Sequence, residues 1–451
     1  MNIAVIGGGI AGLAAAWLLS RQHTVTLFER HAQPGFVAHS LAVDGVRVDV
    51  PLRVFYPGYY PTLTRLYARL GVATEPVSYA TTFTGADGQP FFRWRNLRLG
   101  GRSYPYVLPQ DVATRRARRI VQGALRFNRH ARAALARGDL AGRSIGDFVS
   151  AHRLPDEYVE GLLLPALATI ATCTTEDARA YPADVVAGYV AGGLARQSVR
   201  RAVHGADDAA RRLAAGIDRV VCQAGVQAVQ QHGLQVHVRR AGGVEARFDH
   251  VVLATQANQA AALWQQPPAD MAQAMAGFRY RPLQVVMHRD SRLMPARRAD
   301  WSPVNARVCE GQDRPESTIW VNAVQPALRR AALVLQTVQP QRAPRDELVL
   351  GQAQFERPLV DHGSQQALAS LQRLQNGPAA AAAGRRVWLC GSYAQGGVPL
   401  LESAVRSACE VAAALGADVD AALGVAMGEA LDTSGRRTTP AARGLRADSS
   451  T

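Results

Sequence analysis

The chain has 451 residues, of which 48% are hydrophobic, and its formal net charge is +15. All 51 of its basic residues are arginines, because the sequence contains no lysine. This excludes Schiff-base lysine chemistry and a lysine general base. The apolar content is sufficient for two or three domains with substantial cores. No stretch after residue 20 reaches the roughly 18 uncharged apolar residues that a membrane-spanning helix needs.

The positive charge leaves two interpretations open. One is attraction to nucleic acid, anionic lipid or an acidic partner, and the other is an ordinary solvated surface rich in arginine. Nucleic acid is disfavoured, because the sequence has no zinc-finger spacing and no basic stretch interleaved with aromatic residues. The five cysteines are odd in number and far apart, which favours reduced thiols in the cytoplasm over disulfides or a metal site. We therefore predict no nucleic-acid partner and no metal ligands.

The first thirty residues contain a glycine motif whose spacing suits the binding of a phosphate group. A β-branched run at residues 3–6 predicts a buried strand, and residues 11–19 predict a buried helix. Between them, Gly7, Gly9 and Gly12 have the spacing G-x-G-x-x-G. The first glycine permits a tight turn, the second lets backbone approach a pyrophosphate, and the third lets the helix pack closely on the strand. The helix N-terminus then offers free N–H groups to the phosphates.

A second strand is expected at residues 24–28, and Glu29 ends it. This acid lies seventeen residues after Gly12, close to where a carboxylate accepts a hydrogen bond from a ribose hydroxyl. The alternative is a signal peptide or membrane helix, since residues 1–20 carry no charged side chain. A signal peptide needs a basic beginning, and the first charged side chain is Arg21. The strand, turn, helix, strand and acid together favour nucleotide binding.

The next part of the chain is predicted to be mixed and then helical. Residues 41–50 read as a hairpin turning at Asp44-Gly45, and Pro61 begins a helix that Gly71 stops. The remaining elements up to residue 204 are strands within 82–99, one or two helices over 111–137, and mostly helix over 144–194. The segment 111–137 is amphipathic and very basic, so it predicts either a helix with a solvated polar face or peripheral contact with an anionic membrane.

The second half of the chain is expected to return twice to a buried parallel sheet. The segment FDHVVLAT (248–255) is a charged turn leading into a buried strand, and RRVWLC (385–390) is another. The other expected elements are a helix in 205–217, strands in 220–229 and 234–239, mixed strands in 276–339 (including STIWVNAV and ALVLQTV), a helix over 401–415, and a disordered tail from about residue 432.

These elements predict an α/β fold in which a discontinuous Rossmann-like nucleotide-binding domain carries an inserted, mixed α+β substrate domain. We expect the nucleotide-binding domain in segments 1–80, 205–260 and 384–420. The substrate domain would comprise 81–204, mainly helical, and 261–383, mainly a mixed sheet. We expect residues 421–451 to form a disordered tail.

The motif Gly7, Gly9, Gly12 and Glu29, the segment FDHVVLAT, and RRVWLCGSYAQGGVPLLESAVRSACEVAAAL near the C-terminus resemble the signatures of the flavin-dependent amine oxidase and phytoene desaturase superfamily. The resemblance implies FAD, which we expect to be bound non-covalently. It also implies adenine contact by the Val226 backbone, phosphate and ribityl contact by Gly391 and Ser392, and a pyrimidine edge beside Leu401 and Glu402. The implied cofactor-binding residues are Gly7, Gly9, Ile10, Ala11, Gly12, Glu29, Arg30, Val226, Ala254, Gly391, Ser392, Leu401 and Glu402.

Within that superfamily the chain is most similar to bacterial flavoproteins associated with fatty-acid cyclopropane or methyl modification. The segments VDVPLRVFYPGYYPTLTRLYARLGV, VVMHRDSRLMPARRADW and STIWVNAVQ carry this resemblance. The chain departs from the family pattern at three points. A second glycine is missing around Pro34, Pro51 replaces a glycine after Asp49, and Leu401 replaces a histidine of the lipid-associated members. These departures bear on the substrate and the flavin geometry more than on FAD binding.

The resemblance implies a dehydrogenase or desaturase that takes hydride from a hydrophobic substrate, with a lipid as one candidate. The alternatives are a flavin amine oxidase, which the absence of lysine disfavours, and a flavin-binding protein with a non-redox role as an isomerase or accessory subunit. His288 is a candidate catalytic base, since it lies on an expected substrate-domain strand, and a structural role is its alternative. The tyrosines of the segment 56–60 line either a cavity or the core.

We expect a cytoplasmic protein, with peripheral contact at the inner membrane face as the alternative, and leave the oligomeric state open.

Overall fold

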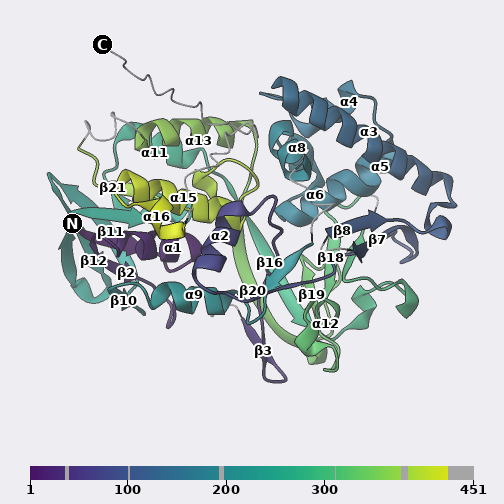
Figure 1. The fold of residues 1–451 in the computed structure, drawn as a ribbon, viewed down its shortest axis with the longest axis horizontal. Coiled ribbons are helices and arrows are strands. Elements are labelled where there is room, and N and C mark those ends of the chain that lie inside the picture. The colour runs from purple at the N-terminus through teal and green to yellow at the C-terminus, as the bar shows by residue number, and fades with distance from the viewer. Residues whose placement is uncertain (36–39, 100–101, 192–197, 310, 377–383, 425–451) are drawn as a thin grey trace, which may run out of the picture.

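A computed structural model describes residues 1–451 except 36–39, 100–101, 192–197, 310, 377–383 and 425–451. The part of the molecule on the left in Figure 1 is built around a five-stranded parallel sheet. In spatial order the strands are β10 (Arg219–Val221), β2 (Thr24–Phe28), β1 (Asn2–Ile6), β14 (His250–Leu253) and β21 (Val387–Leu389). Three segments far apart in the sequence therefore build one sheet, and the predicted α/β fold class is confirmed.

The parallel sheet is buried on both faces, as its uninterrupted apolar strands require. Along β1, Ile3 and Val5 belong to one hydrophobic cluster, whereas Ala4 and Ile6 belong to another. This alternation follows from the two-residue period of a strand. The first face is covered by helices α1 (Ile10–Leu19), α2 (Pro61–Arg69), α9 (Ala206–Ala214), α15 (Leu401–Ala414) and α16 (Val419–Leu423). Every residue of α1 is buried, because the sheet, α9 and α15 surround it (Figure 1).

The second face carries a mixed sheet, antiparallel except for the parallel pair β11–β15, and three helices. The sheet has the order β13 (Glu245–Phe248), β12 (Gln235–Arg240), β11 (Val226–His232) and β15 (Trp264–Gln265), and the helices are α10 (Ala257–Leu263), α11 (Ala269–Ala276) and α13 (His362–Gln375). Met271 and Leu371 lie in the same cluster as Leu389 of the parallel sheet. Both ends of the segment 261–383, which we predicted to belong to the substrate domain, therefore pack on the nucleotide-binding unit. No sequence pattern indicates this packing, because the apolar side chains of α11 and α13 suit any core.

A second large sheet of eight strands occupies the lower right of Figure 1. Its order is β20 (Val349–Pro358), β16 (Tyr280–His288), β19 (Leu335–Val338), β18 (Glu316–Trp320), β17 (Val304–Arg307), β6 (Thr81–Thr84), β7 (Pro90–Leu99) and β8 (Arg102–Tyr106). The description of 81–204 as mainly helical is thus wrong for its first 26 residues, because β6 pairs in parallel with β17 and carries β7 and β8 into the sheet.

The prediction of a strand over STIWVNAV is correct only for its first half. It ends at Trp320, and α12 (Val321–Val324) follows. The cause is the Asn322 side chain, whose Oδ1 accepts from the Val334 N–H at 2.7 Å and whose Nδ2 donates to the Leu328 carbonyl at 2.8 Å. These bonds take the place of ladder hydrogen bonds.

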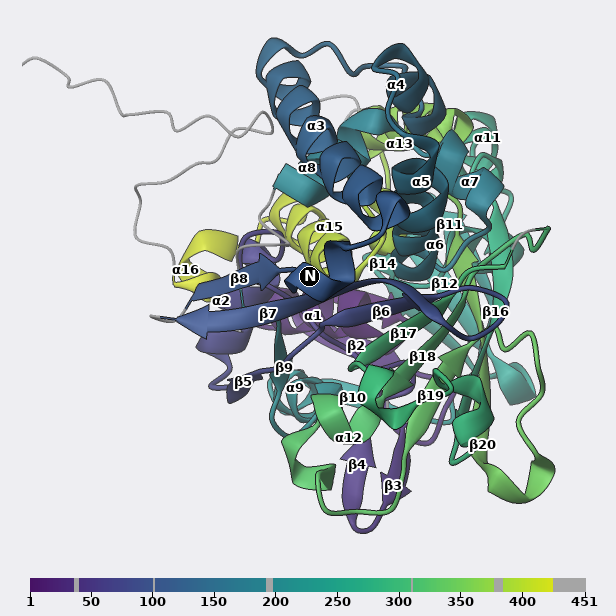
Figure 2. The ribbon, with the colours of Figure 1, turned by 90° about the vertical axis from the view of Figure 1, so that its right-hand side faces the viewer.

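A helical layer lies above the eight-stranded sheet (Figures 1 and 2). It comprises α3 (Arg115–Arg137), α4 (Ile145–Ala151), α5 (Asp156–Tyr158), a π-helical turn (Val159–Leu163), α6 (Leu164–Ala171), α7 (Thr175–Ala180) and α8 (Ala183–Ala191). The basic segment forms one helix of 23 residues, which the Thr114 side chain caps at its N-terminus. Gly138 ends it with φ = 74°, a conformation that suits glycine.

The smaller elements agree with the predicted turns. The hairpin of β3 (Leu41–Val43) and β4 (Val46–Val48) turns at Asp44 and Gly45, both with positive φ, as a two-residue hairpin turn requires. A separate pair joins β5 (Thr74–Pro76) to β9 (Arg200–Ala202). Residues 421–423, which we placed in the tail, complete α16, and the rest of the predicted tail lies outside the described residues. Within the described chain, no helix is long and apolar enough to cross a bilayer.

Candidate functional site

A cleft of about 620 Å³ opens at the carboxyl ends of the parallel strands. Residues that follow β1, β2 and β14 directly, and β21 after one residue, line it, and β16 and β20 of the large sheet form its opposite wall. Ligands of open α/β sheets bind at this edge. The volume is in the range of sites for cofactors and drug-sized molecules.

The three glycines of the loop have different surroundings in this cleft. Gly7 has φ = 107°, and a Cβ on it would lie 2.7 Å from the Ala254 carbonyl oxygen. A Cβ on Gly12 would lie only 1.9 Å from the Gly7 carbonyl oxygen. A Cβ on Gly9, in contrast, would meet no atom within 4 Å. Contacts within the protein thus require glycine at positions 7 and 12. At Gly9 the protein leaves space that a ligand can fill.

The N-terminus of α1 points its free groups toward this opening. Gly9 is its N-cap residue, no side chain of the described chain caps the helix, and its first turn contains no acid. The unpaired N–H groups and the positive end of the helix dipole therefore favour an anion. Gly9, Ile10 and Ala11 all line the cleft, while Gly12 lies behind them against the strand. The residues present fit the diphosphate of a dinucleotide.

Glu29 lies at the edge of this loop and is 8% exposed. Its Oε2 accepts from the Gly8 N–H at 2.7 Å, and its Oε1 accepts from the His31 N–H at 2.8 Å. The carboxylate therefore fixes the loop to the end of β2. Each of its oxygens keeps a second lone pair, so Glu29 can also accept from a ligand hydroxyl in the cleft that it lines.

The structure brings most of the other residues predicted for cofactor binding to the same cleft. Arg30, Val226, Ala254, Gly391 and Ser392 all line it. The backbone bulges at Val226, where the register of β11 against β12 shifts. Segments that lie hundreds of residues apart in the sequence therefore meet around one opening.

Leu401 and Glu402 do not line the cleft, although Ala404 of the same helix does. The Glu402 carboxylate accepts from the Thr62 N–H at 3.0 Å and the Leu63 N–H at 2.9 Å, at the beginning of α2. Its burial raises its pKa, while these hydrogen bonds lower it. Glu402, which we expected beside the pyrimidine edge of the flavin, therefore has a different role here. It caps α2, a helix outside the C-terminal sequence motif.

His288 lies away from the cleft, in the interior of the eight-stranded sheet, and is fully buried. Its Nε2 lies 2.7 Å from Thr337 Oγ1, and its Nδ1 accepts from the Asp290 N–H at 3.1 Å. Burial lowers its pKa to about 4, so the ring is neutral near pH 7. Both ring nitrogens are engaged within the sheet, and this favours a structural role for His288 over the expected catalytic one.

Reasoning from the sequence missed the side chains of the opposite wall. Tyr280 and Arg357 line the cleft from β16 and β20, and Tyr393 lines it from the loop after β21. The Arg357 Nε donates to Thr172 Oγ1 at 3.1 Å, and no carboxylate of the described chain forms an ion pair with its guanidinium. Its burial lowers its pKa. No motif marks this position, since Arg357 is one arginine among 51.

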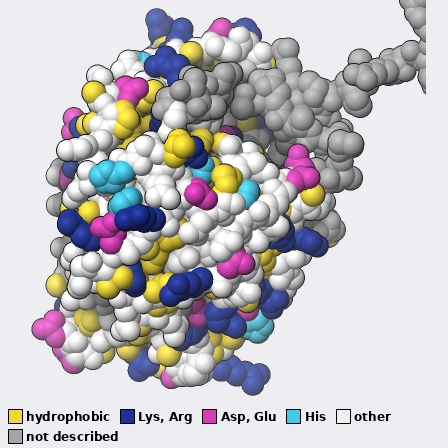
Figure 3. All heavy atoms as spheres, turned by 90° about the vertical axis from the view of Figure 1, so that its left-hand side faces the viewer, with side chains coloured by type: hydrophobic (Ala, Val, Ile, Leu, Met, Phe, Trp, Pro, Cys, Tyr) yellow, Lys and Arg dark blue, Asp and Glu magenta, His cyan; other side chains and the backbone are white. Residues whose placement is uncertain are grey.

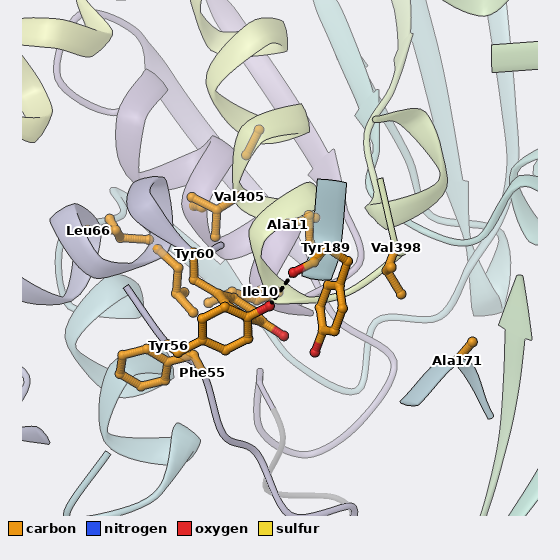
Figure 4. Packing of buried hydrophobic residues seen from close by; sticks show 14 of the residues in the cluster. Ile10, Ala11, Phe55, Tyr56, Tyr60, Leu66, Ala171, Tyr189, Val398 and Val405 are labelled. Carbon is orange, nitrogen blue, oxygen red and sulfur yellow. Dashed lines mark hydrogen bonds between the residues drawn. The ribbon is translucent and has the colours of Figure 1, made fainter. Parts of the chain in front are cut away.

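The tyrosines after β4 pack in the core beside the cleft (Figure 4). Tyr56 and Tyr60 are almost completely buried, and the Tyr56 hydroxyl donates to the Tyr189 carbonyl at 3.1 Å. Ile10 and Ala11, which line the cleft, belong to the same cluster. The tyrosines are therefore core residues that support the cleft wall from behind.

Cys390 precedes the loop that lines the cleft and is fully buried. Burial raises the pKa of its thiol to about 12, which makes it a poor nucleophile. The described chain also contains no group of three His, Cys, Asp or Glu side chains that could hold a metal ion.

Comparisons with known proteins agree with this geometry. A family model described as an NAD(P)-binding Rossmann-like domain matches residues 5–70, which contain the end of β1, the glycine loop, α1 and β2. A search among curated proteins finds no match. Among solved structures, a fatty acid isomerase from P. acnes that produces CLA is similar over 90% of this chain and 96% of its own, with a TM-score of 0.61 and 14% identity.

Two amine oxidases share the architecture as well. Putrescine oxidase is similar over 92% of this chain and 99% of its own, with a TM-score of 0.63 and 14% identity. Cyclohexylamine oxidase from Brevibacterium oxydans is similar over 92% and 98%, with a TM-score of 0.64 and 15% identity. At these identities the likeness concerns the fold. The chain thus has the two-part α/β fold of these enzymes, with a Rossmann-like domain at its N-terminus.

Proposed function

We propose that this protein is an FAD-dependent oxidoreductase, a dehydrogenase or desaturase, that takes hydride from a hydrophobic substrate. The observation that carries the proposal is the combination of an uncapped α1 N-terminus with open space at Gly9, in a cleft at the carboxyl ends of the parallel strands. The similarity to two oxidases and a fatty acid isomerase supports the choice of a flavin over a nicotinamide cofactor.

Different parts of the cleft would hold different parts of FAD. The N-terminus of α1 would hold the diphosphate, Glu29 a ribose hydroxyl, and the backbone at Val226 the adenine. Gly391 and Ser392 would face the flavin end of the cofactor. When bound, FAD supplies the hydride-accepting ring, and the protein orients the substrate and excludes water.

The opposite wall bears on the substrate. Arg357 places a cationic guanidinium in the cleft, which repels the ammonium group of an amine, whereas the Glu356 carboxylate on the same wall is already bonded to Asn258 Nδ2 at 3.1 Å. The absence of lysine points the same way. We therefore favour a neutral or anionic hydrophobic substrate over an amine. A fatty acid is the candidate. An association with cyclopropane or methyl modification of fatty acids is the narrower form of this proposal.

A second candidate is a flavin-dependent isomerase without net redox change. The similarity to the fatty acid isomerase over 90% of the chain favours it. The two candidates differ in a measurable way, because only the oxidoreductase leaves reduced flavin after anaerobic reaction with its substrate.

The cofactor proposal is tested by the absorption spectrum of the purified protein before and after acid precipitation. The two visible bands of oxidised flavin, recovered in the supernatant, are the expected result. Gly9→Val should lose the bands, because its side chain fills the open place in the cleft. Gly188→Val is the matched control, since a Cβ on this half-buried glycine of α8 also meets nothing within 4 Å. A colourless wild type that takes up no added FAD, or full flavin content in the Gly9 variant, would contradict the proposal.

The reaction is tested next, by anaerobic addition of oleate, linoleate or cyclohexylamine to the flavin-loaded protein. Bleaching by a fatty acid supports the oxidoreductase acting on a lipid. A shift of the linoleate double bonds into conjugation without bleaching supports the isomerase. Bleaching by cyclohexylamine alone, with peroxide formed in air, would replace both with an amine oxidase.

A further inference from the structure

One side of the molecule exposes an unusual concentration of apolar side chains. The described chain has eight strongly exposed large hydrophobic residues, and five of them lie on β7, β8 and α3. These five are Leu97, Leu99, Tyr104, Tyr106 and Leu125. Leu99 and Leu125 are 68% and 69% exposed. Single exposed hydrophobic residues are ordinary, but a contiguous group marks an interaction site.

The register of the β7–β8 hairpin places four of these residues on one face. Leu97 pairs directly with Tyr104 across the two strands. Leu99 and Tyr106 are each two residues further along, so they point to the same side. The other face contains Ser103, which is 1% exposed and accepts from Asn96 Nδ2 at 2.9 Å. Leu97, Leu99, Tyr104 and Tyr106 are therefore exposed together on one face of the hairpin, which they share with Arg95 opposite Tyr106.

The exposed face of α3 is basic. Arg115, Arg118, Arg129 and Arg132 follow one another with Leu125 at intervals of three, four and seven residues, so they share one side of the helix. The opposite side carries the buried Ile120 and Phe127 of the core. The sequence of α3 contains no acid, and in the described chain none of these four arginines pairs with a carboxylate.

The hairpin and the helix are held together as one surface. Arg95 of β7 bonds to Asp111, in the short turn that leads into α3, at 2.7 Å. Arg116 of α3 stacks over the ring of Phe91 of β7, 3.7 Å from its centre. Figure 2 shows α3, β7 and β8 on the same side of the molecule. The far side, in Figure 3, instead mixes arginines with acidic side chains.

We propose that this hairpin–helix surface docks the protein on an anionic lipid bilayer. It consists of Leu97, Leu99, Tyr104 and Tyr106 of the hairpin together with Arg115, Arg118, Leu125, Arg129 and Arg132 of α3. The leucines and tyrosines enter the interfacial layer, where an apolar body with a polar tip is favoured. The arginines bind lipid phosphates, and each contributes about fivefold to partitioning onto an anionic membrane.

Charge complementarity favours lipid over a second copy of this chain. A symmetric dimer through this surface would bring two sets of unpaired arginines together, whereas an anionic bilayer neutralises them. The outward apolar face of a narrow hairpin also matches shallow insertion. The inference does not depend on FAD binding, and it goes beyond the proposed reaction.

The test is flotation of the full-length protein with vesicles of phosphatidylcholine alone or mixed with phosphatidylglycerol. The wild type should float with the mixed vesicles, and added salt should weaken this binding. The variant L97S/L99S/Y104S should bind at least tenfold more weakly. The variant R118Q/R129Q/R132Q should lose the preference for phosphatidylglycerol by about a hundredfold, from three arginines at about fivefold each.

Two variants on other surfaces serve as matched controls. Leu234→Ser removes another strongly exposed leucine, and R219Q/R329Q/R330Q removes three exposed arginines elsewhere. Both should bind vesicles like the wild type. Unchanged melting temperatures show that all variants are folded. Absence of wild-type binding to mixed vesicles, equal loss in the controls, or a dimer in solution that the hairpin variant converts to monomer without any vesicle binding would each overturn the proposal.

Discussion

The two walls of the cleft are built in different ways. The wall at β1 and α1 is made by backbone: Gly7 and Gly12 permit the close approach, and free N–H groups face the opening. The wall at β16 and β20 is made by side chains, among them Tyr280, Glu356 and Arg357, which come from strands of another sheet. A site made of backbone is encoded in a short stretch of sequence, because only glycines at fixed intervals allow it. A site made of side chains depends on how distant strands are placed.

The strongest test of the backbone wall is Gly12→Ala. A Cβ there would lie 1.9 Å from the Gly7 carbonyl oxygen, so α1 must move away from β1. We expect a loss of about 3 kcal/mol or more in the free energy of unfolding, with loss of bound FAD as a consequence. Urea denaturation measures the first effect. Gly9→Ala is the comparison, and it should change stability by less than about 1 kcal/mol, since its Cβ meets nothing. Equal destabilisation by both would mean that the two glycines do not differ in role.

A second test separates the structural interior of the large sheet from the cleft. His288 has a pKa of about 4 in the folded protein and about 6.5 when unfolded. Between these values only the unfolded chain takes up the proton, so the stabilisation is complete above about pH 6.5 and decreases as the pH falls toward 4. The loss amounts to about 3 kcal/mol at most.

The variant His288→Asn removes this titrating group and keeps an acceptor for the Asp290 N–H. Its stability should depend less on pH between 7 and 5 than that of the wild type, as measured by urea denaturation at each pH. Some dependence remains, because burial also lowers the pKa of His250 to about 4. A variant that keeps the full pH dependence, or that loses substrate turnover while its stability is unchanged, would contradict the structural role.

The fold was largely predictable because apolar strands and glycine spacing are local signals. The segments FDHVVLAT and RRVWLC led to β14 and β21 of the parallel sheet. It could not be predicted that α11 and α13 pack on the nucleotide-binding unit, because an amphipathic pattern does not indicate which sheet a helix covers. The same limit explains Glu402. Its position at the start of α15 suggested the cofactor, but its actual partners, the first N–H groups of α2, lie about 340 residues away in sequence.

Glu402→Gln tests this helix-cap role. The glutamine keeps one acceptor but loses the charge, and its NH₂ group faces an N–H of α2. We expect a loss of about 2 kcal/mol in the free energy of unfolding, with FAD content unchanged after purification. Thermal unfolding and the absorption spectrum measure the two properties. Loss of FAD with unchanged stability would return Glu402 to the cofactor site, where the sequence motif had placed it.

The smallest expected effect concerns the side-chain wall, and it rests on the proposed function. Arg357 lines the cleft without an ion-pair partner in the described chain. An anionic ligand would therefore gain a charge-assisted hydrogen bond there. Arg357→Met should retain FAD and bind dodecanoate about tenfold more weakly than the wild type, a difference of about 1.4 kcal/mol. The measurement is the change that dodecanoate causes in the flavin absorption spectrum.

Dodecanol provides the matched control, because it has the same chain without the charge. Its affinity should be similar in the wild type and in Arg357→Met, and Arg357→Lys should recover part of the affinity for dodecanoate. If the variant weakens both ligands equally, Arg357 shapes the wall and does not select charge. If dodecanoate binds more tightly without the arginine, the cleft favours a neutral substrate, and the fatty-acid candidate gives way to an uncharged hydrophobic molecule.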